Sequence, residues 1–180
     1  MTLPPRSAPA DVALPEDLRE RTGEAGLVRF VLEAVQTVNL PRTGPAACDG
    51  AGNPLRPQVM LSVLTYAYGI GLYGSHQIEL ATLREGGLSY LCAGAQPDAQ
   101  ALRRFRRRHR ERVKHCLQRV LELVYEFRLW LAHAATVPCG VGEAPAAGFT
   151  GSARGSPDFA LAAEERLERA VLLDSVTLDE

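Results

Sequence analysis

Apolar residues recur every three or four positions in several stretches of this chain, and this spacing predicts helices. The first predicted helix covers residues 24–40, with an apolar face made of Leu27, Val28, Phe30, Val31, Ala34, Val35 and Val38. The second covers residues 58–70 and follows Pro57, because proline is favourable at a helix N-terminus. Residues 58–75 carry no charge, so we expect this second helix to be buried.

The pattern continues through two shorter helices into a long one. Helices are expected over residues 75–85, with Ser75 as N-cap, and over residues 88–92. Asp98 can then cap a long helix, whose apolar stripe consists of Leu102, Phe105, His109, Val113, Cys116, Val120, Leu123 and Phe127. A weaker pattern predicts a short helix over residues 158–173.

Glycine and proline separate these helices, and residues 41–57 are expected to form a loop without strands. The predicted domains are a disordered leader (1–14), one helical domain (15–133), a loop or disordered segment (134–157) and a tail (158–180). The fold class is therefore predicted to be all-α. It is a helical bundle with a helix-turn-helix-like arrangement and one long basic C-terminal helix.

Charge changes the picture at one place. The whole chain has a formal net charge of −1, yet residues 103–114 contain eight arginine and lysine residues and one acid. Such a local excess of positive charge on a near-neutral chain indicates a polyanionic partner. The alternative is a solvated helix face without a specific role.

Helical geometry divides these cations into sets. At about 100° per residue from Leu102, the side chains of the first set project away from the apolar stripe, and those of the second lie on its shoulder. The first set is Arg104, Arg107 and Arg108; the second is Arg103, Arg110 and Lys114. Arg106 instead falls inside the apolar face. We favour a pair between Arg106 and a partly buried acid, such as Glu79 or Asp98, over a phosphate contact.

Composition limits the setting of the protein. The four cysteines, Cys48, Cys92, Cys116 and Cys139, are far apart, which fits reduced thiols better than a disulfide framework. The N-terminus has prolines and acids where a signal peptide needs an apolar core. Residues 59–73 are too short and too polar for a membrane span. We therefore expect a cytoplasmic protein without membrane contact.

Residues 56–109, RPQVMLSVLTYAYGIGLYGSHQIELATLREGGLSYLCAGAQPDAQALRRFRRRH, resemble the N-terminal helical domain of bacterial insertion-sequence transposases, the InsH-type group of the DDE class. The matching positions are Pro57, Met60, Leu61, Leu64, Tyr66, Tyr68, Gly71, Ser75, Ile78, Glu79, Tyr90, Leu91, Pro97, Asp98, Phe105, Arg106, Arg107 and His109. The resemblance covers about residues 14–130. Its structural motif includes Glu79, Pro97, Asp98, Phe105 and Arg106.

The resemblance implies binding of double-stranded DNA at the terminal inverted repeats of a mobile element, and thus a place at the nucleoid. The six cations that face outward or lie on the shoulder would then contact phosphates. Two departures reduce the expected sequence preference. His76 and Gln77 stand where the family has paired arginines. Ala99, Gln100 and Ala101 stand where the family has polar residues after Pro-Asp, which shortens any reach to base edges.

The family's catalytic domain carries three metal-binding carboxylates, the first in a strand similar to V–DGT. Residues 131–145 here, LAHAATVPCGVGEAP, lack that aspartate. The later acids Glu164, Glu165, Glu168 and Asp174 have helical spacing and a surface-like pattern. We therefore predict no catalytic residues, no metal and no cofactor. The expectation is a non-enzymatic, truncated or frameshifted remnant of a transposase.

A protein-interaction module is the alternative reading. In it, the apolar stripe of residues 102–127 pairs with a second copy of the chain or with a full-length transposase. The same stripe is equally suited to form the domain's own core against the second helix. Metal sites and nucleophilic catalysis have no support, because the histidines and cysteines lack ligand spacing and no acid orients Ser75 and His76.

Overall fold

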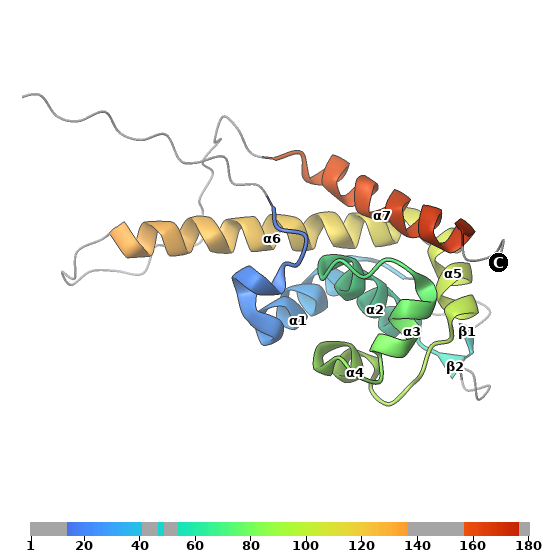
Figure 1. Cartoon of the computed structure of the whole chain (residues 1–180). Helices are drawn as coiled ribbons and strands as arrows, with labels where there is room; N and C mark the ends of the chain where they lie inside the picture. The colour runs from blue at the N-terminus through green and yellow to red at the C-terminus, as the bar shows by residue number, and fades with distance from the viewer. Residues whose placement is uncertain (1–13, 41–46, 49–53, 137–156, 177–180) are drawn as a thin grey trace, which may run out of the picture.

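The computed structural model describes residues 14–40, 47–48, 54–136 and 157–176, which form an all-α bundle (Figure 1). The predicted fold class is thereby confirmed. The helices of the described residues are α1 (Arg19–Thr37), α2 (Pro57–Gly69), α3 (Ser75–Ala81), α4 (Gly86–Cys92), α5 (Ala99–Arg108), α6 (Arg110–Thr136) and α7 (Phe159–Val176). The sequence predicted no strands, but β1 (Ala47–Cys48) and β2 (Pro54–Leu55) form one short antiparallel pair.

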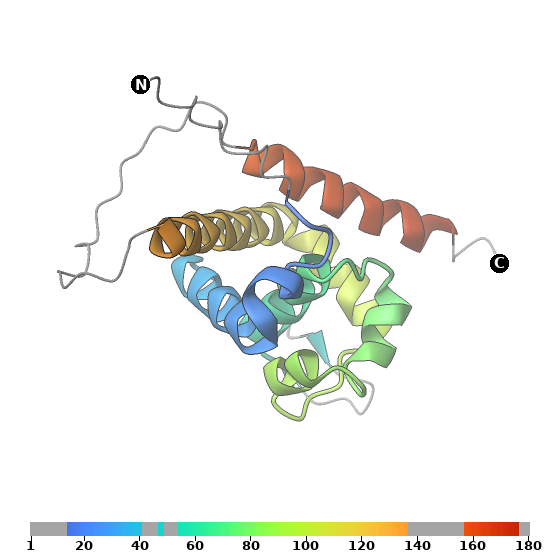
Figure 2. The same cartoon turned by 60° about the vertical axis from the view of Figure 1, so that its left-hand side comes forward.

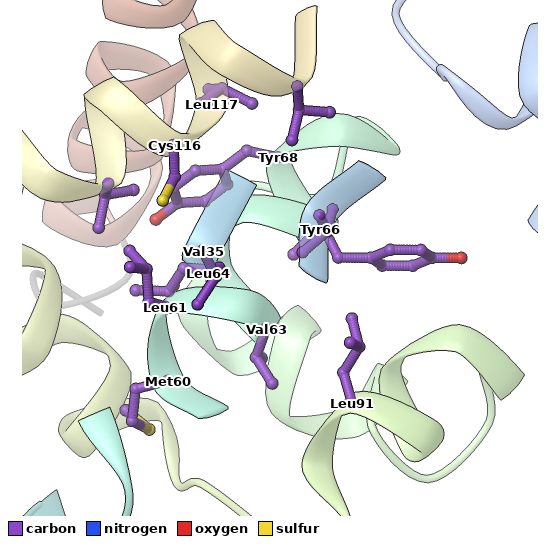
Figure 3. Packing of buried hydrophobic residues seen from close by; sticks show 14 of the residues in the cluster. Val35, Met60, Leu61, Val63, Leu64, Tyr66, Tyr68, Leu91, Cys116 and Leu117 are labelled. Carbon is purple, nitrogen blue, oxygen red and sulfur yellow. The ribbon is translucent and has the colours of Figure 1, made fainter. Parts of the chain in front are cut away.

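The uncharged helix α2 is the centre of the core. Every residue from Met60 to Gly69 is buried, because α1, α4, α5 and α6 all pack against this helix. Figure 3 shows side chains of α2 between Cys116 and Leu117 of α6 on one side and Leu91 of α4 on the other. The segment is therefore a core helix, as predicted. None of the described helices combines the length and the apolar character needed to cross a bilayer.

Several helix boundaries differ from the predicted ones. α1 starts at Arg19, and Gly23 interrupts it with φ of 70°, a left-handed conformation that favours glycine. The continuous part of α1 therefore begins where the first helix was predicted. Gly86 and Gly87, expected as a turn, form the first residues of α4. α3 ends at Ala81, four residues before the predicted end.

The predicted long helix is two helices. α5 ends at Arg108, and His109 has non-helical dihedral angles (φ −121°, ψ 28°) before α6 begins at Arg110. The helices then run in different directions, as both views show (Figures 1 and 2). α5 packs on α3 and α2, whereas α6 packs on α1, α2 and α7. The basic segment therefore occupies a junction between two helices.

The predicted tail helix is confirmed, and it is part of the bundle. α7 lies along α6 (Figures 1 and 2), and Ala163, Leu167 and Ala170 join the hydrophobic core. The basic helix is thus followed by a further packed helix. Residues 134–136 belong to α6, while residues 1–13 and 137–156, predicted to be a leader and a loop, lie outside the described residues.

Candidate nucleic-acid interface

The cations of the basic segment lie on α5 and on the first turns of α6. Asp98 fixes the start of α5 as predicted, because its Oδ1 atom accepts a hydrogen bond of 2.5 Å from the backbone N–H of Ala101. Pro97 is buried immediately before this cap. The residue pattern therefore positions the basic segment at a defined place on the bundle.

Three of the six candidate contacts face solvent together. Arg104, Arg107 and Arg108 are exposed and lie three and four residues apart, on one face of α5. No ion pair joins these three side chains to any acid in the part of the chain that the structure describes. This cluster, Arg104, Arg107 and Arg108, is called the exposed arginine face below.

Glu164 of α7 forms ion pairs with two of the other three cations that were predicted to contact DNA. Its Oε1 atom accepts a hydrogen bond from Arg110, and its Oε2 atom lies 2.7 Å from the Lys114 Nζ atom. Hydrogen bonds from Lys114 and Arg110 lower the pKa of the Glu164 carboxyl. The bond between Lys114 and Glu164 also raises the pKa of Lys114. Both cations are thus already paired with an acid of the same chain.

Arg106 is buried, as predicted, but its partner is Asp174 of α7. An Arg106 guanidinium nitrogen lies 2.5 Å from Asp174 Oδ2, and another donates a 3.2 Å hydrogen bond to the Tyr68 hydroxyl. Arg103 Nε lies 3.6 Å from the same Asp174 oxygen. The prediction that Glu79 or Asp98 pairs with Arg106 is wrong. Each of these two carboxylates instead accepts a hydrogen bond from a backbone N–H at the start of α5.

Asp174 is also held by α3. Its two oxygens accept hydrogen bonds from the backbone N–H of Ser75 at 2.8 Å and from the Ser75 hydroxyl at 2.5 Å. Burial favours the neutral carboxyl, but the bonds from Ser75 and Arg106 outweigh burial and lower the pKa of Asp174. Ser75 was predicted to cap α3. It is instead the first helical residue, and its side chain is used for this bond.

The remaining motif residues connect α3 to α5. Glu79 Oε2 accepts a 3.2 Å hydrogen bond from the Ala99 backbone N–H and lies 3.4 Å from His76. Phe105 is buried, and its ring centroid is 4.5 Å from that of His109. These residues build the frame that carries the exposed arginine face.

Sequence reasoning missed the role of Asp174, which it assigned to a surface-like pattern. A signal was present: Ala163, Leu167, Ala170 and Asp174 follow one another at helical spacing and form the inner face of α7. A carboxylate that continues an apolar stripe indicates burial with a partner. Tyr68 was matched only as a motif position, although burial raises the pKa of its hydroxyl to about 12 and keeps it neutral.

The chain was compared with protein-family models, with curated proteins and with solved structures. No match was found. The resemblance to transposase N-terminal domains therefore stays a prediction that rests on the quoted residues. No group of three or more His, Cys, Asp or Glu side chains suited to a metal ion occurs within residues 14–40, 47–48, 54–136 and 157–176.

Proposed function

We propose that this chain is a DNA-binding module that holds the phosphates of double-stranded DNA with the exposed arginine face. The observation that carries the proposal is the gathering of Arg104, Arg107 and Arg108 on one solvent-exposed side of α5, in a chain of net charge −1. Guanidinium groups bind phosphate oxygens with two parallel hydrogen bonds, which makes arginine well suited to this contact.

The resemblance to transposase N-terminal domains supports a more specific form of the proposal. In that form, the DNA is the terminal inverted repeat of an insertion sequence, and the helix-turn-helix-like part comprises α3 to α5. The module acts without catalysis of its own. Phosphate contacts carry little sequence information, so we expect modest preference for the repeat over unrelated duplex.

The test is fluorescence anisotropy with a labelled duplex and the full chain. Three phosphate contacts would give a salt slope of about −2.7, so affinity should fall roughly 40-fold between 50 and 200 mM salt. The variant R104A/R107A/R108A should lose this binding. The matched control R21A/R29A/R84A removes the same charge from three exposed arginines outside α5 and should bind like the parent chain. Equal loss in both variants would contradict a defined contact surface.

An interaction module is the second candidate function, and the structure changes where its surface would lie. The predicted stripe is core, since Leu102, Val113, Cys116 and Val120 are fully buried. Large exposed apolar side chains of α7 are Leu161, Val171, Leu172, Leu173 and Val176, and others lie on α1, α3, α4 and α6. A second copy of the chain, or a full-length transposase, would meet the side of α7 that carries Leu172 and Val176. Sedimentation analysis of the parent chain and of L172S/V176S tests self-association.

A further inference from the structure

Two acids of α7 lie against the basic segment. Glu164 pairs with Arg110 and Lys114, and Asp174 lies beside Arg103 and Arg106. The sequence predicted six cations that contact a polyanion. Three of them therefore lie next to a carboxylate of α7, and these are Arg103, Arg110 and Lys114. The three without such an acid are the exposed arginine face.

The two acids differ in how firmly they are held. Asp174 is 3% exposed and lies among Ser75, Tyr68 and Arg106, so it anchors the C-terminal end of α7. Glu164 is at the surface, with side-chain exposures of 25% for itself, 37% for Arg110 and 29% for Lys114. Water and ions reach this outer pair, so a polyanion can compete for it at moderate cost.

We propose that α7 is a built-in competitor of DNA, in which Glu164 occupies Arg110 and Lys114 and must leave them before they bind phosphates. This inference rests on the proposed DNA-binding function and adds its regulation. With Glu164 in place, the exposed arginine face binds alone. When Glu164 is displaced, Arg110 and Lys114 extend the contact from α5 onto α6. The ligand is the phosphate backbone of duplex DNA.

The variant E164Q keeps the size of the side chain and removes its charge, so it should free both cations. Two added phosphate contacts make the salt slope steeper by about 1.8, and the loss of affinity between 50 and 200 mM salt grows from roughly 40-fold to roughly 500-fold. The matched control is E165Q, which removes the same charge from the exposed neighbour of Glu164. E165Q should behave like the parent chain apart from a small general charge effect.

A second measurement needs no DNA. Lys114 is the single lysine of the chain, so acetylation of its amino group can be followed by peptide mass spectrometry. If Glu164 covers Lys114, acetylation should be faster in E164Q than in the parent chain and in E165Q. Saturating duplex should then slow it in E164Q. A thermal melt of each variant shows that the bundle remains folded.

The outcomes separate the two proposals. Equal affinity and equal salt slope in E164Q and E165Q, while R104A/R107A/R108A loses binding, would overturn competition by α7 and leave DNA binding in place. Binding by E164Q but not by the parent chain would support competition by α7 and would overturn binding by the exposed arginine face alone. Absence of binding by every variant at low salt would overturn both. Equal acetylation rates in the parent chain and in E164Q would contradict the claim that Glu164 shields the amino group of Lys114.

Discussion

Asp174 Oδ2 lies 2.5 Å from a guanidinium nitrogen of Arg106, and 68 residues separate the two in the sequence. Their side chains are 4% and 3% exposed. The pair joins the last turn of α7 to α5 and, through Ser75, to α3. A segment expected to be a tail therefore closes the frame around the basic segment.

Breaking this pair from one side should strongly destabilise the fold. In D174A, Arg106 stays buried without its carboxylate, so we expect a loss of about 3–5 kcal/mol in the free energy of unfolding. The double variant R106M/D174L should lose less than D174A, because no unpaired charge remains. Urea unfolding of both variants measures the coupling, and E168A is the control, expected within about 0.5 kcal/mol of the parent chain. A loss in R106M/D174L as large as that in D174A would contradict the pair.

Arg166 of α7 holds the residues just before α1, and the end of α2, against α7. Its guanidinium donates to the backbone carbonyls of Pro15, Glu16, Tyr68 and Gly69, at 2.7, 2.9, 2.6 and 3.4 Å. A lysine ammonium cannot reach these carbonyls in a fork, so R166K should cost about 1.5–3 kcal/mol of unfolding free energy. Thermal or urea unfolding checks this value.

Arg169 provides the comparison for that experiment. It lies one turn away on the same helix, is exposed, and pairs with Glu16 at 3.2 Å. Exposed ion pairs contribute little, so R169K should leave the stability nearly unchanged. If R166K were as mild as R169K, the fork of Arg166 would not hold α2 and α7 together.

Local sequence patterns predicted the positions of most helices and the central part of the core. The uncharged run from Met60 to Gly69 predicted the central helix, and Asp98 predicted the start of α5. The break at His109 could not be predicted in this way, because no proline or glycine marks it. It results from the packing of α5 on α3 while α6 follows α1, and such tertiary preferences are absent from any local window.

The candidate site was predictable only in part for a similar reason. Projection angles correctly separated Arg106 from the exposed arginines. They could not show that Glu164 pairs with Arg110 and Asp174 with Arg106. Both pairs depend on how α7, more than 50 residues away in the sequence, packs against α5 and α6. Charge counting therefore overestimated the number of free cations. The pairing acids came from the segment that looked least informative.

Gly87 lies where the Tyr66 hydroxyl and ring meet the start of α4. A Cβ atom at Gly87 would overlap this buried tyrosine, whereas one at Gly86 would meet only the mobile carboxylate of Glu24. G87A should therefore cost about 1–3 kcal/mol of unfolding free energy through overpacking. G86A should be nearly neutral, because the Glu24 side chain can rotate away. Urea unfolding of the two variants distinguishes them, and equal effects would contradict a close approach of Tyr66 to α4.

His109, at the junction of α5 and α6, should make stability depend on pH. Arg112 can only donate, so its 2.8 Å contact with His109 Nδ1 needs a neutral imidazole. Burial, followed by the charges of Arg112 and Arg108, lowers the pKa of His109 below its ordinary value of 6.5. Between the lowered and the ordinary pKa, the unfolded chain binds more protons than the folded one. The contribution of His109 to stability is therefore present above pH ~6.5 and is lost as the pH falls.

Urea unfolding at pH 7, 6 and 5 measures this contribution. We expect the parent chain to lose stability over this range, and H109Q to lose less because glutamine does not titrate. The control is H115Q, since His115 is exposed and one helix turn and a half further along α6. Asp174 does not interfere, because its pKa is lowered from the ordinary value of an aspartate and its carboxylate stays charged throughout. The same pH dependence in H109Q as in the parent chain would show that the junction does not hold a neutral imidazole.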